Sequence, residues 1–270
     1  MGGLFDLTGK VVLVTGSTKG IAKAAVERLA EHGAKVVVSS RNQAECDAVA
    51  ADIEKRFGAG RTLAKAADIE RHDDLKALVA KALDKFGRVD TLVANASLVS
   101  AGNIEQMNVD DFDVACRGIV TQSALLAKLC AEPMKKQGGG SIVFLSSSAA
   151  TAVLQDFPAY GVAKAGLMQL GRILAVHWGP YNIRVNTIVP GVTRSESTRG
   201  MWENADALKM VVGRTPLGRI GEADELAAGI VFFASPGSGF ITGHTLLIDG
   251  GIVMKGAEGL HELMASMPAA

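Results

Sequence analysis

Residues 11–40 read VVLVTGSTKGIAKAAVERLAEHGAKVVVSS, and this stretch decides the fold. Its apolar start, Val11–Thr15, is typical of a strand that is buried on both faces. A turn with two glycines follows, and then an amphipathic stretch over residues 21–32 that Gly33 ends. A second β-rich run occupies residues 36–39. Strand, glycine turn, helix and strand in this order predict a βαβ unit of a parallel sheet.

The same alternation of short apolar runs and longer amphipathic stretches continues along the chain. It predicts further strands at 62–67, Thr91–Ala94, 141–146, 184–189 and Thr245–Ile248, and helices at Gln43–Phe57, 73–86, Val109–Lys136 and 159–177. No linker rich in Pro, Gly or Ser divides the sequence. We therefore expect one α/β domain over residues 1–270, a doubly wound, Rossmann-type parallel sheet of seven strands with helices on both faces.

Two segments depart from this rhythm. Residues 192–216 form a long, polar insert that contains Met201 and Trp202. Because ligands bind at the carboxyl ends of parallel strands, this insert is either a lid over a substrate or a loop with a structural role. Residues 252–270 form a C-terminal extension, which either covers a neighbouring subunit or is flexible.

The composition is that of an ordinary globular protein. Lys and Arg number 28, Asp and Glu also number 28, and 48% of residues are apolar. A net charge of zero gives no reason to expect nucleic acid or an anionic membrane as a partner. The cysteines and histidines show no metal-binding spacing, and no apolar run reaches the roughly 18 residues of a membrane span. Without a secretory leader pattern, we expect a cytoplasmic protein with no metal site.

The glycine turn lies between the first predicted strand and the first predicted helix. Glycines allow the backbone to approach a pyrophosphate closely, and the helix N-terminus offers free N–H groups and partial positive charge. The position of this turn therefore predicts a dinucleotide site, although many turns of this kind hold glycine for structural reasons alone. The candidate contacts are Gly16, Thr18, Lys19, Gly20 and Ile21.

The end of the second strand indicates which dinucleotide binds. A site for NAD(H) normally places an acidic residue here to bind the ribose 2′-hydroxyl. This strand instead ends in Ser40 and Arg41, which suit a 2′-phosphate, and Lys19 lies within reach in the glycine turn. Two cations and no carboxylate predict that NADP(H) is preferred over NAD(H). The alternative is that both cations are solvated surface charges.

Three residues at the ends of the third and fourth strands complete the predicted cofactor site. Asp68 and Ile69 follow the third strand, and the Asp68 side chain either contacts the adenine or caps a turn. Asn95 follows the fourth strand, where we expect it to anchor the backbone near the ribose.

Tyr160 and Lys164 lie four residues apart on a predicted helix, so their side chains share one face. An ammonium group near a tyrosine favours the tyrosinate and lowers the pKa of the phenol, which makes it a usable acid and base. A hydroxyl from Ser147, at the end of the fifth strand, is placed to steady a developing charge on a substrate oxygen. Tyr-x-x-x-Lys alone is a common helical spacing, and its alternative interpretation is a surface pair.

Taken together, these motifs resemble the short-chain dehydrogenase/reductase family over about residues 7–251. The matching segments are TGSTKGIA, ANAS, SIVFLSS, YGVAK, VNTIVPG and the ending TPLGRIGEADELAAGIVFFAS with ITGHTLLIDGG. The resemblance implies that Ser147, Tyr160 and Lys164 are catalytic. It also implies that Pro190, Gly191, Thr193 and Ser195 flank the nicotinamide, and that the protein is a homotetramer, or a homodimer, paired through its long fourth and fifth helices.

The sequence departs from the family pattern at several positions. The third family glycine is Ala22, and the N-N-A-G pattern becomes residues 94–97, ANAS. The family asparagine of the fourth helix falls at Ala115. That asparagine is thought to hold a water that joins the lysine to solvent, so alanine leaves the proton relay in question. These departures keep open a second hypothesis, a low-turnover NADP(H)-binding sensor or scaffold.

The leading hypothesis is an NADP(H)-dependent oxidoreductase that interconverts a ketone and a secondary alcohol. The substrate is expected to be a small, neutral and partly hydrophobic carbonyl or alcohol, because the residues around the predicted site are mainly apolar. A 3-oxoacyl thioester and a polyol or sugar are the alternatives. Candidate substrate contacts, which could equally pack the core or an interface, are Ser97, Leu154, Phe157, Met201 and Trp202.

Overall fold

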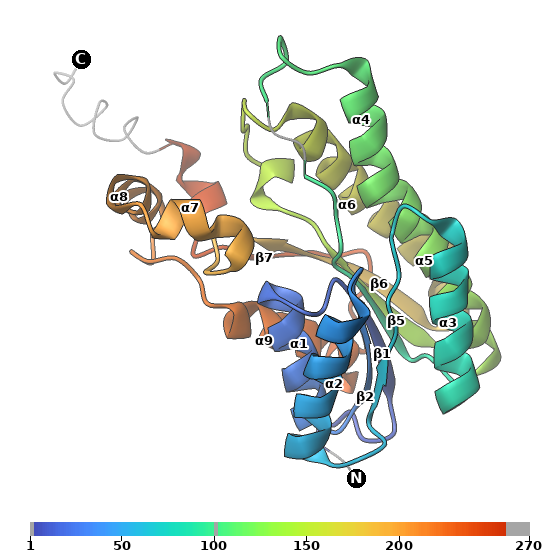
Figure 1. Ribbon diagram of the computed structural model, residues 1–270. Helices are drawn as coiled ribbons and strands as arrows, with labels where there is room; N and C mark the ends of the chain where they lie inside the picture. The colour runs from blue at the N-terminus through green and yellow to red at the C-terminus, as the bar shows by residue number, and fades with distance from the viewer. Residues whose placement is uncertain (1–2, 100–101, 258–270) are drawn as a thin grey trace, which may run out of the picture.

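A single seven-stranded parallel sheet organises the protein (Figure 1). The structure is a computed structural model that describes residues 3–99 and 102–257. The strands lie in the order β3-β2-β1-β4-β5-β6-β7. Their bounds are β1 Val11–Thr15, β2 Lys35–Ser39, β3 Thr62–Ala64, β4 Thr91–Ala94, β5 Gly140–Leu145, β6 Ile183–Pro190 and β7 Thr245–Ile248. The doubly wound fold class predicted from the sequence is confirmed.

Alternate residues of each strand point into two separate cores, one on each face of the sheet. In β1, Val11 and Leu13 belong to one core, whereas Val12 and Val14 belong to the other. All five residues of β1 are buried. Side chains that alternate between two buried faces are mostly apolar, which is why these strands have nearly continuous apolar sequences.

Helices cover both faces. On one side lie α1 (Gly20–Glu31), α2 (Gln43–Phe57) and α9 (Ala223–Ala234), and on the other α3 (His72–Phe86), α4 (Val109–Cys116), α5 (Gln122–Lys136) and α6 (Pro158–Trp178) (Figure 1). Sequence periodicity did not predict α9. Its hydrophobic residues surround most of the helix rather than forming one stripe, and a capping box between Glu222 and Glu225 defines its start.

Residues Val109–Lys136 form a continuous helical stretch, as predicted, but with one interruption. A π-helical turn, η1 (Arg117–Thr121), separates α4 from α5. By length and composition alone this stretch is apolar enough to cross a membrane, and half of its most apolar window is buried inside the fold. The buried half, which includes Ala115, Ile119 and Leu126, packs in the core on one face of the sheet.

The insert at residues 192–216 is largely helical. It contains η4 (Glu196–Thr198), α7 (Arg199–Trp202) and α8 (Ala205–Arg214). In Figure 1, α7 and α8 lie together beyond one edge of the sheet, apart from the two helical layers. Of the C-terminal extension, η6 (Ile252–Ala257) is seen, and residues 258–270 are outside the described residues.

Candidate functional site

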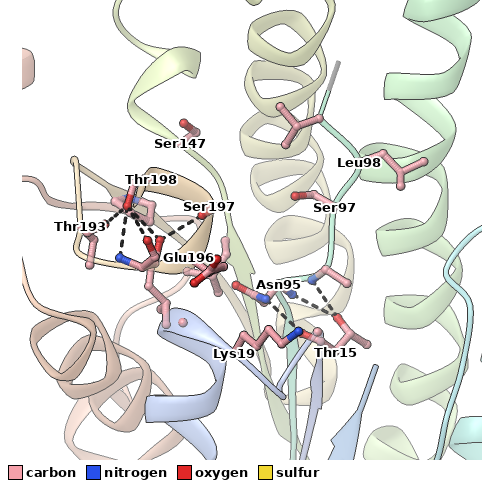
Figure 2. A pocket seen from close by; sticks show the side chains of 18 of the residues that line it. Thr15, Lys19, Asn95, Ser97, Leu98, Ser147, Thr193, Glu196, Ser197 and Thr198 are labelled. Atoms are coloured by element: carbon pink, nitrogen blue, oxygen red, sulfur yellow. Dashed lines mark hydrogen bonds between the residues drawn. The ribbon is translucent and has the colours of Figure 1, made fainter. Parts of the chain in front are cut away.

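A cleft with a volume of about 870 Å³ opens at the carboxyl ends of the strands. Figure 2 shows Asn95 and Ser97 on one side, Thr193 and Glu196 on the other, and Ser147 between them. Open parallel sheets bind their ligands at this edge because the loops after the strands diverge there. The segments that carry the predicted cofactor and catalytic residues therefore converge on one cleft.

The turn between β1 and α1 has the backbone that the sequence predicts for a pyrophosphate site. Gly16 has a φ of +68°, and a Cβ there would lie 3.0 Å from Nδ2 of Asn95. Lys19, the N-cap residue of α1, makes no side-chain capping bond, and the first turn of the helix holds no acidic residue. The first N–H groups of the helix thus lack a capping side chain, and no acidic residue of the first turn competes for them. These features fit the phosphates of a dinucleotide.

The ends of β1 and β4 are joined by hydrogen bonds beneath the cleft. The backbone amides of Asn95 and Ala96 both donate to Oγ1 of Thr15 at 3.2 Å, and Nδ2 of Asn95 donates to the Thr15 carbonyl. From the other side, Nε2 of Gln122 donates to the Ala96 carbonyl at 3.0 Å. Asn95 therefore anchors the backbone at the position where the sequence placed it (Figure 2).

At the end of the cleft beside β2, the structure brings together charged side chains that lie far apart in the sequence. Ser40, Arg41 and Lys19 all line the cleft, as predicted. However, the carboxylate of Glu45 also lies there, 2.9 Å from the Lys19 amine. The premise that the site holds two cations and no carboxylate was wrong. Glu45 follows the end of β2 by six residues and reaches the glycine turn only because α2 folds back toward it.

The two residues after β3 differ in their placement. Ile69 lines the cleft, beside Leu75 of α3. Asp68 does not line it: Oδ1 of Asp68 accepts a hydrogen bond from the Glu70 amide at 3.0 Å. Of the two roles predicted for the Asp68 side chain, the structure shows the turn-capping one.

Tyr160 and Lys164 project from α6 toward the end of β5, where Ser147 lies. Lys164 is only 3% exposed, and its Nζ donates a hydrogen bond to the Leu145 carbonyl at 2.7 Å. The same Nζ lies 5.6 Å from the centroid of the Tyr160 ring. The ring of Phe157 packs against Tyr160 edge-on, with 6.4 Å between the centroids. The predicted helical pair therefore lies at the cleft, with Lys164 buried and Tyr160 half-buried.

Burial dominates the protonation of both residues. Desolvation raises the pKa of Tyr160, and a hydrogen bond with the Ser147 side chain opposes that rise. Desolvation also lowers the pKa of Lys164 to about 7, because a buried ammonium loses its hydration. A lysine with this pKa exchanges its proton near neutral pH. Perturbed titratable groups in a cleft are a frequent mark of a catalytic site.

The sequence of this chain matches the family profile described as Enoyl-(Acyl carrier protein) reductase over residues 16–253. That span covers the glycine turn, the Ser147–Tyr160–Lys164 group and β7. The chain belongs to the short-chain dehydrogenase/reductase family. It is therefore an oxidoreductase of a family whose members act on alcohols, polyols and hydroxy acids with nicotinamide cofactors.

Two curated family members show the extent of the likeness. An uncharacterized oxidoreductase of Thermotoga maritima is 39% identical over 250 residues, which cover 91% of this chain and 98% of that protein. D-threitol dehydrogenase of Mycolicibacterium smegmatis is 34% identical over 253 residues, or 93% of this chain and 95% of that protein.

Two solved family structures carry different cofactors. A gluconate 5-dehydrogenase from Burkholderia cenocepacia, in complex with NADP and tartrate, is 28% identical with a TM-score of 0.87, and the match covers 93% of this chain and 98% of that one. A 7α-hydroxysteroid dehydrogenase complexed with NADH and a 7-oxo bile acid is 31% identical with a TM-score of 0.88, covering 92% and 96%.

Of the residues predicted to contact the substrate or the nicotinamide in this family member, all but Trp202 line the cleft. Trp202 does not line the cleft: its Nε1 donates to the Ser195 carbonyl at 3.0 Å, and its ring lies 4.9 Å from the Arg194 guanidinium and 5.9 Å from that of Arg199. It fastens α7 to the segment before it. The lining residues are Ser97, Leu154, Phe157, Met201, Pro190, Gly191, Thr193 and Ser195.

Several polar residues of the cleft were missed by the sequence analysis. Glu196, Ser197 and Thr198 of η4 line it together with Ser148. The Thr198 hydroxyl donates to the Thr193 carbonyl, which closes this part of the insert into a tight turn (Figure 2). The only sequence signal of the η4 residues was their position after β6, whereas Ser148 lies in the serine run that follows β5. Within the described residues, no group of three metal-ligating side chains is found.

The departures from the family pattern are accommodated in the fold. Ala22 is buried in the core against α9 and the sheet, so its extra methyl finds space. Ala115 is 1% exposed. Seven residues later, Gln122 is also buried, and its Oε1 has no hydrogen-bond partner among the described residues. The helix that lost its family asparagine thus carries another buried amide, on the residue that follows the π-helical turn.

Proposed function

We propose that this family member is an NADP(H)-dependent oxidoreductase that interconverts a ketone and a secondary alcohol. The observation that carries the proposal is that Tyr160 and Ser147 line one cleft, with the buried amine of Lys164 5.6 Å from the centroid of the Tyr160 ring. The nicotinamide cofactor would supply or accept the hydride. Gly16, Gly20 and the N-terminus of α1 would hold its pyrophosphate.

The side chains of the chain itself would handle the proton. The Tyr160 hydroxyl gives its proton to a carbonyl oxygen in reduction and takes one from an alcohol in oxidation. Ser147 donates a hydrogen bond to the same oxygen and stabilises its developing charge. Lys164, when protonated, lowers the pKa of Tyr160 through its charge. Because burial places the pKa of Lys164 at about 7, it can return a proton near neutral pH.

The preference for NADP(H) is supported by the end of β2. Ser40 and Arg41 line the cleft there, and Arg41 makes no hydrogen bond or ion pair with another residue in the described part of the chain. An exposed, unpaired guanidinium is suited to a 2′-phosphate.

The apolar part of the substrate cavity favours a neutral, partly hydrophobic substrate. Leu154, Phe157 and Met201 line it beside Ser97. A polyol is the second candidate, because Glu196 and Ser197 put polar groups on the opposite wall, and because a relative is a D-threitol dehydrogenase.

The test is turnover with a panel of ketones, 3-oxoacyl thioesters, polyols and hydroxy acids, with NADPH or NADP⁺, in wild type and Tyr160→Phe. We expect oxidation of NADPH by at least one ketone, and a loss of about 10²- to 10⁴-fold in Tyr160→Phe. Cofactor binding, measured by NADPH fluorescence, should be retained in the variant. Cofactor binding without turnover of any panel member would favour the sensor or scaffold instead.

We also propose a homo-oligomer, a homotetramer as first choice. The helical stretch Val109–Lys136 is strongly apolar, and half of its most apolar window is left unburied by the single chain. Pairing of this stretch between subunits would bury that surface. Light scattering coupled to size exclusion would measure the mass, and a monomer would refute the proposal.

A further inference from the structure

The two cations at the end of the cleft beside β2 are not equivalent. Arg41 is exposed and makes no polar contact with another described residue. Lys19, in contrast, is engaged: its amine lies 2.9 Å from Oε1 of Glu45. A phosphate that used Lys19 would have to draw it away from that carboxylate or bind beside it.

Glu45 is held in place by its position in α2 and by side chains of the glycine turn. It lies in the first turn of α2, where the helix dipole favours a negative charge, and its amide donates to Oδ1 of the N-cap residue Asn42. Its second carboxylate oxygen accepts a hydrogen bond from the Thr18 hydroxyl at 3.0 Å. Glu45 thus contacts two residues of the glycine turn at once. Hydrogen bonds from Lys19 and Thr18 lower the pKa of the Glu45 carboxyl, so the group is charged at neutral pH.

We infer that Glu45 is a cofactor-specificity residue that weakens binding of the 2′-phosphate and so keeps the protein able to use NAD(H) as well as NADP(H). This inference rests on the proposed cofactor site. The carboxylate acts in two ways: it neutralises Lys19, and it repels a phosphate dianion that approaches the same amine. A ribose 2′-hydroxyl carries no charge, so NAD(H) has no group at the 2′ position on which either effect acts.

The charge of Glu45 is what the inference depends on, so the decisive variant is Glu45→Gln. Glutamine keeps the size of the side chain and an oxygen that accepts from Thr18, but it removes the charge. Asp47→Asn is the matched control. Asp47 lies on the same helix and bonds Gln43 at 2.8 Å, it does not line the cleft, and its change alters the net charge equally.

Binding is measured calorimetrically with two fragments, adenosine 2′,5′-bisphosphate and adenosine 5′-monophosphate, and by fluorescence with NADPH and NADH. We expect Glu45→Gln to lower the dissociation constants of the bisphosphate and of NADPH by about three- to ten-fold. The dissociation constants of the monophosphate and of NADH should stay within about two-fold of the wild-type values. The gain should shrink in high salt. It should also be smaller in Lys19→Met/Glu45→Gln relative to Lys19→Met, because only the direct repulsion between carboxylate and phosphate is then removed. Asp47→Asn should leave the ratio of the two fragments' dissociation constants, and that of the two cofactors' dissociation constants, within about two-fold of wild type.

The outcomes separate this inference from the proposed function. If the fragments and both cofactors bind, but Glu45→Gln leaves the bisphosphate-to-monophosphate ratio unchanged or lowers it, the role of Glu45 is refuted and the cofactor site stands. An equal gain with Asp47→Asn also refutes it, since the effect would then be one of net charge. If neither fragment nor cofactor binds the wild type, the proposed function itself fails, and the inference fails with it.

Discussion

The side-chain amine of Lys164 donates a 2.7 Å hydrogen bond to the backbone carbonyl of Leu145. This bond joins the middle of α6 to the last residue of β5, and it is made almost wholly out of contact with water. A second bond joins the same two segments, from the Ser146 hydroxyl to the Lys164 carbonyl at 2.9 Å. The ionisable amine is therefore placed by the sheet rather than by solvent.

A buried amine makes the stability of the protein depend on pH in a defined way. Burial lowers the pKa of Lys164 from 10.5 to about 7. Between these values the unfolded chain holds a proton that the folded chain does not, so Lys164 makes stability rise with pH by up to about 1.4 kcal/mol per unit. Lys164→Met removes this rise. Its stability relative to wild type should be greatest at pH 7 and below, and should decline toward pH 10.5.

Chemical unfolding of the cofactor-free protein at several pH values measures this difference. Other titrating groups cancel, because they are common to both proteins. A stability difference that does not vary between pH 7 and 10 would mean that Lys164 keeps an ordinary pKa in the folded protein.

Ser147→Ala should lower kcat by about 10²-fold, because it removes a hydrogen-bond donor aimed at the reacting oxygen. It should also move the pH profile of alcohol oxidation upward, since the bond from Ser147 opposes the rise that burial causes in the pKa of Tyr160. Ser148→Ala is the matched control, one residue along and also at the cleft. Steady-state kinetics across pH measures both effects. Equal kcat values and equal pH profiles in the two variants would contradict the catalytic role of Ser147.

Gly16→Ala should weaken cofactor binding by ten-fold or more. Its backbone φ of +68° is strained for alanine, and the new methyl would press on Asn95 and Ala96 at 3.0–3.2 Å. Gly218→Ala is a close control, because Gly218 has the same φ of +68° with nothing within 4 Å of a Cβ. Both variants should lose about 1 kcal/mol of stability to backbone strain. Only Gly16→Ala should lose cofactor affinity in a fluorescence titration, and equal affinities would be inconsistent with crowding.

Trp202→Phe should raise the KM for substrate several-fold with little change in kcat. The variant loses the Nε1 bond to the Ser195 carbonyl and weakens the contact with Arg194 and Arg199. Thermal stability should hardly change, because α7 is a short surface helix. An unchanged KM with a lowered Tm would instead make Trp202 a residue of the fold alone.

The strands and main helices could be predicted because burial on two faces leaves a distinct pattern. Helix boundaries agree closely at α6, predicted as 159–177 and observed as Pro158–Trp178. The third strand ends earlier than predicted, at Ala64, where it is an edge strand with a single neighbour. The interruption of Val109–Lys136 at η1 carries no proline, and its one glycine, Gly118, is of a kind that helical patterns tolerate, so periodicity alone did not reveal it.

At the site, residues adjacent to motifs were predictable and those joined only by folding were not. Tyr160, Lys164 and Ser147 share one helix face and one strand end. Glu45 reaches Lys19 across 26 positions, and this approach depends on how α2 packs. Trp202 was a candidate substrate contact, with packing as the equal alternative, and the structure shows its indole N–H bonded to the Ser195 carbonyl.

The hydroxyl of Thr15 accepts from two consecutive amides of the loop that follows β4. The end of β1 and this loop, which together form the floor of the cleft, are therefore coupled to each other. The conformational entropy lost when a ligand orders these two coupled segments is lost once, whichever part of the cleft is occupied first. Two halves of a dinucleotide added as separate fragments should therefore bind cooperatively, each lowering the dissociation constant of the other. Replacing Thr15 by valine, which keeps the shape and removes the acceptor, should uncouple them.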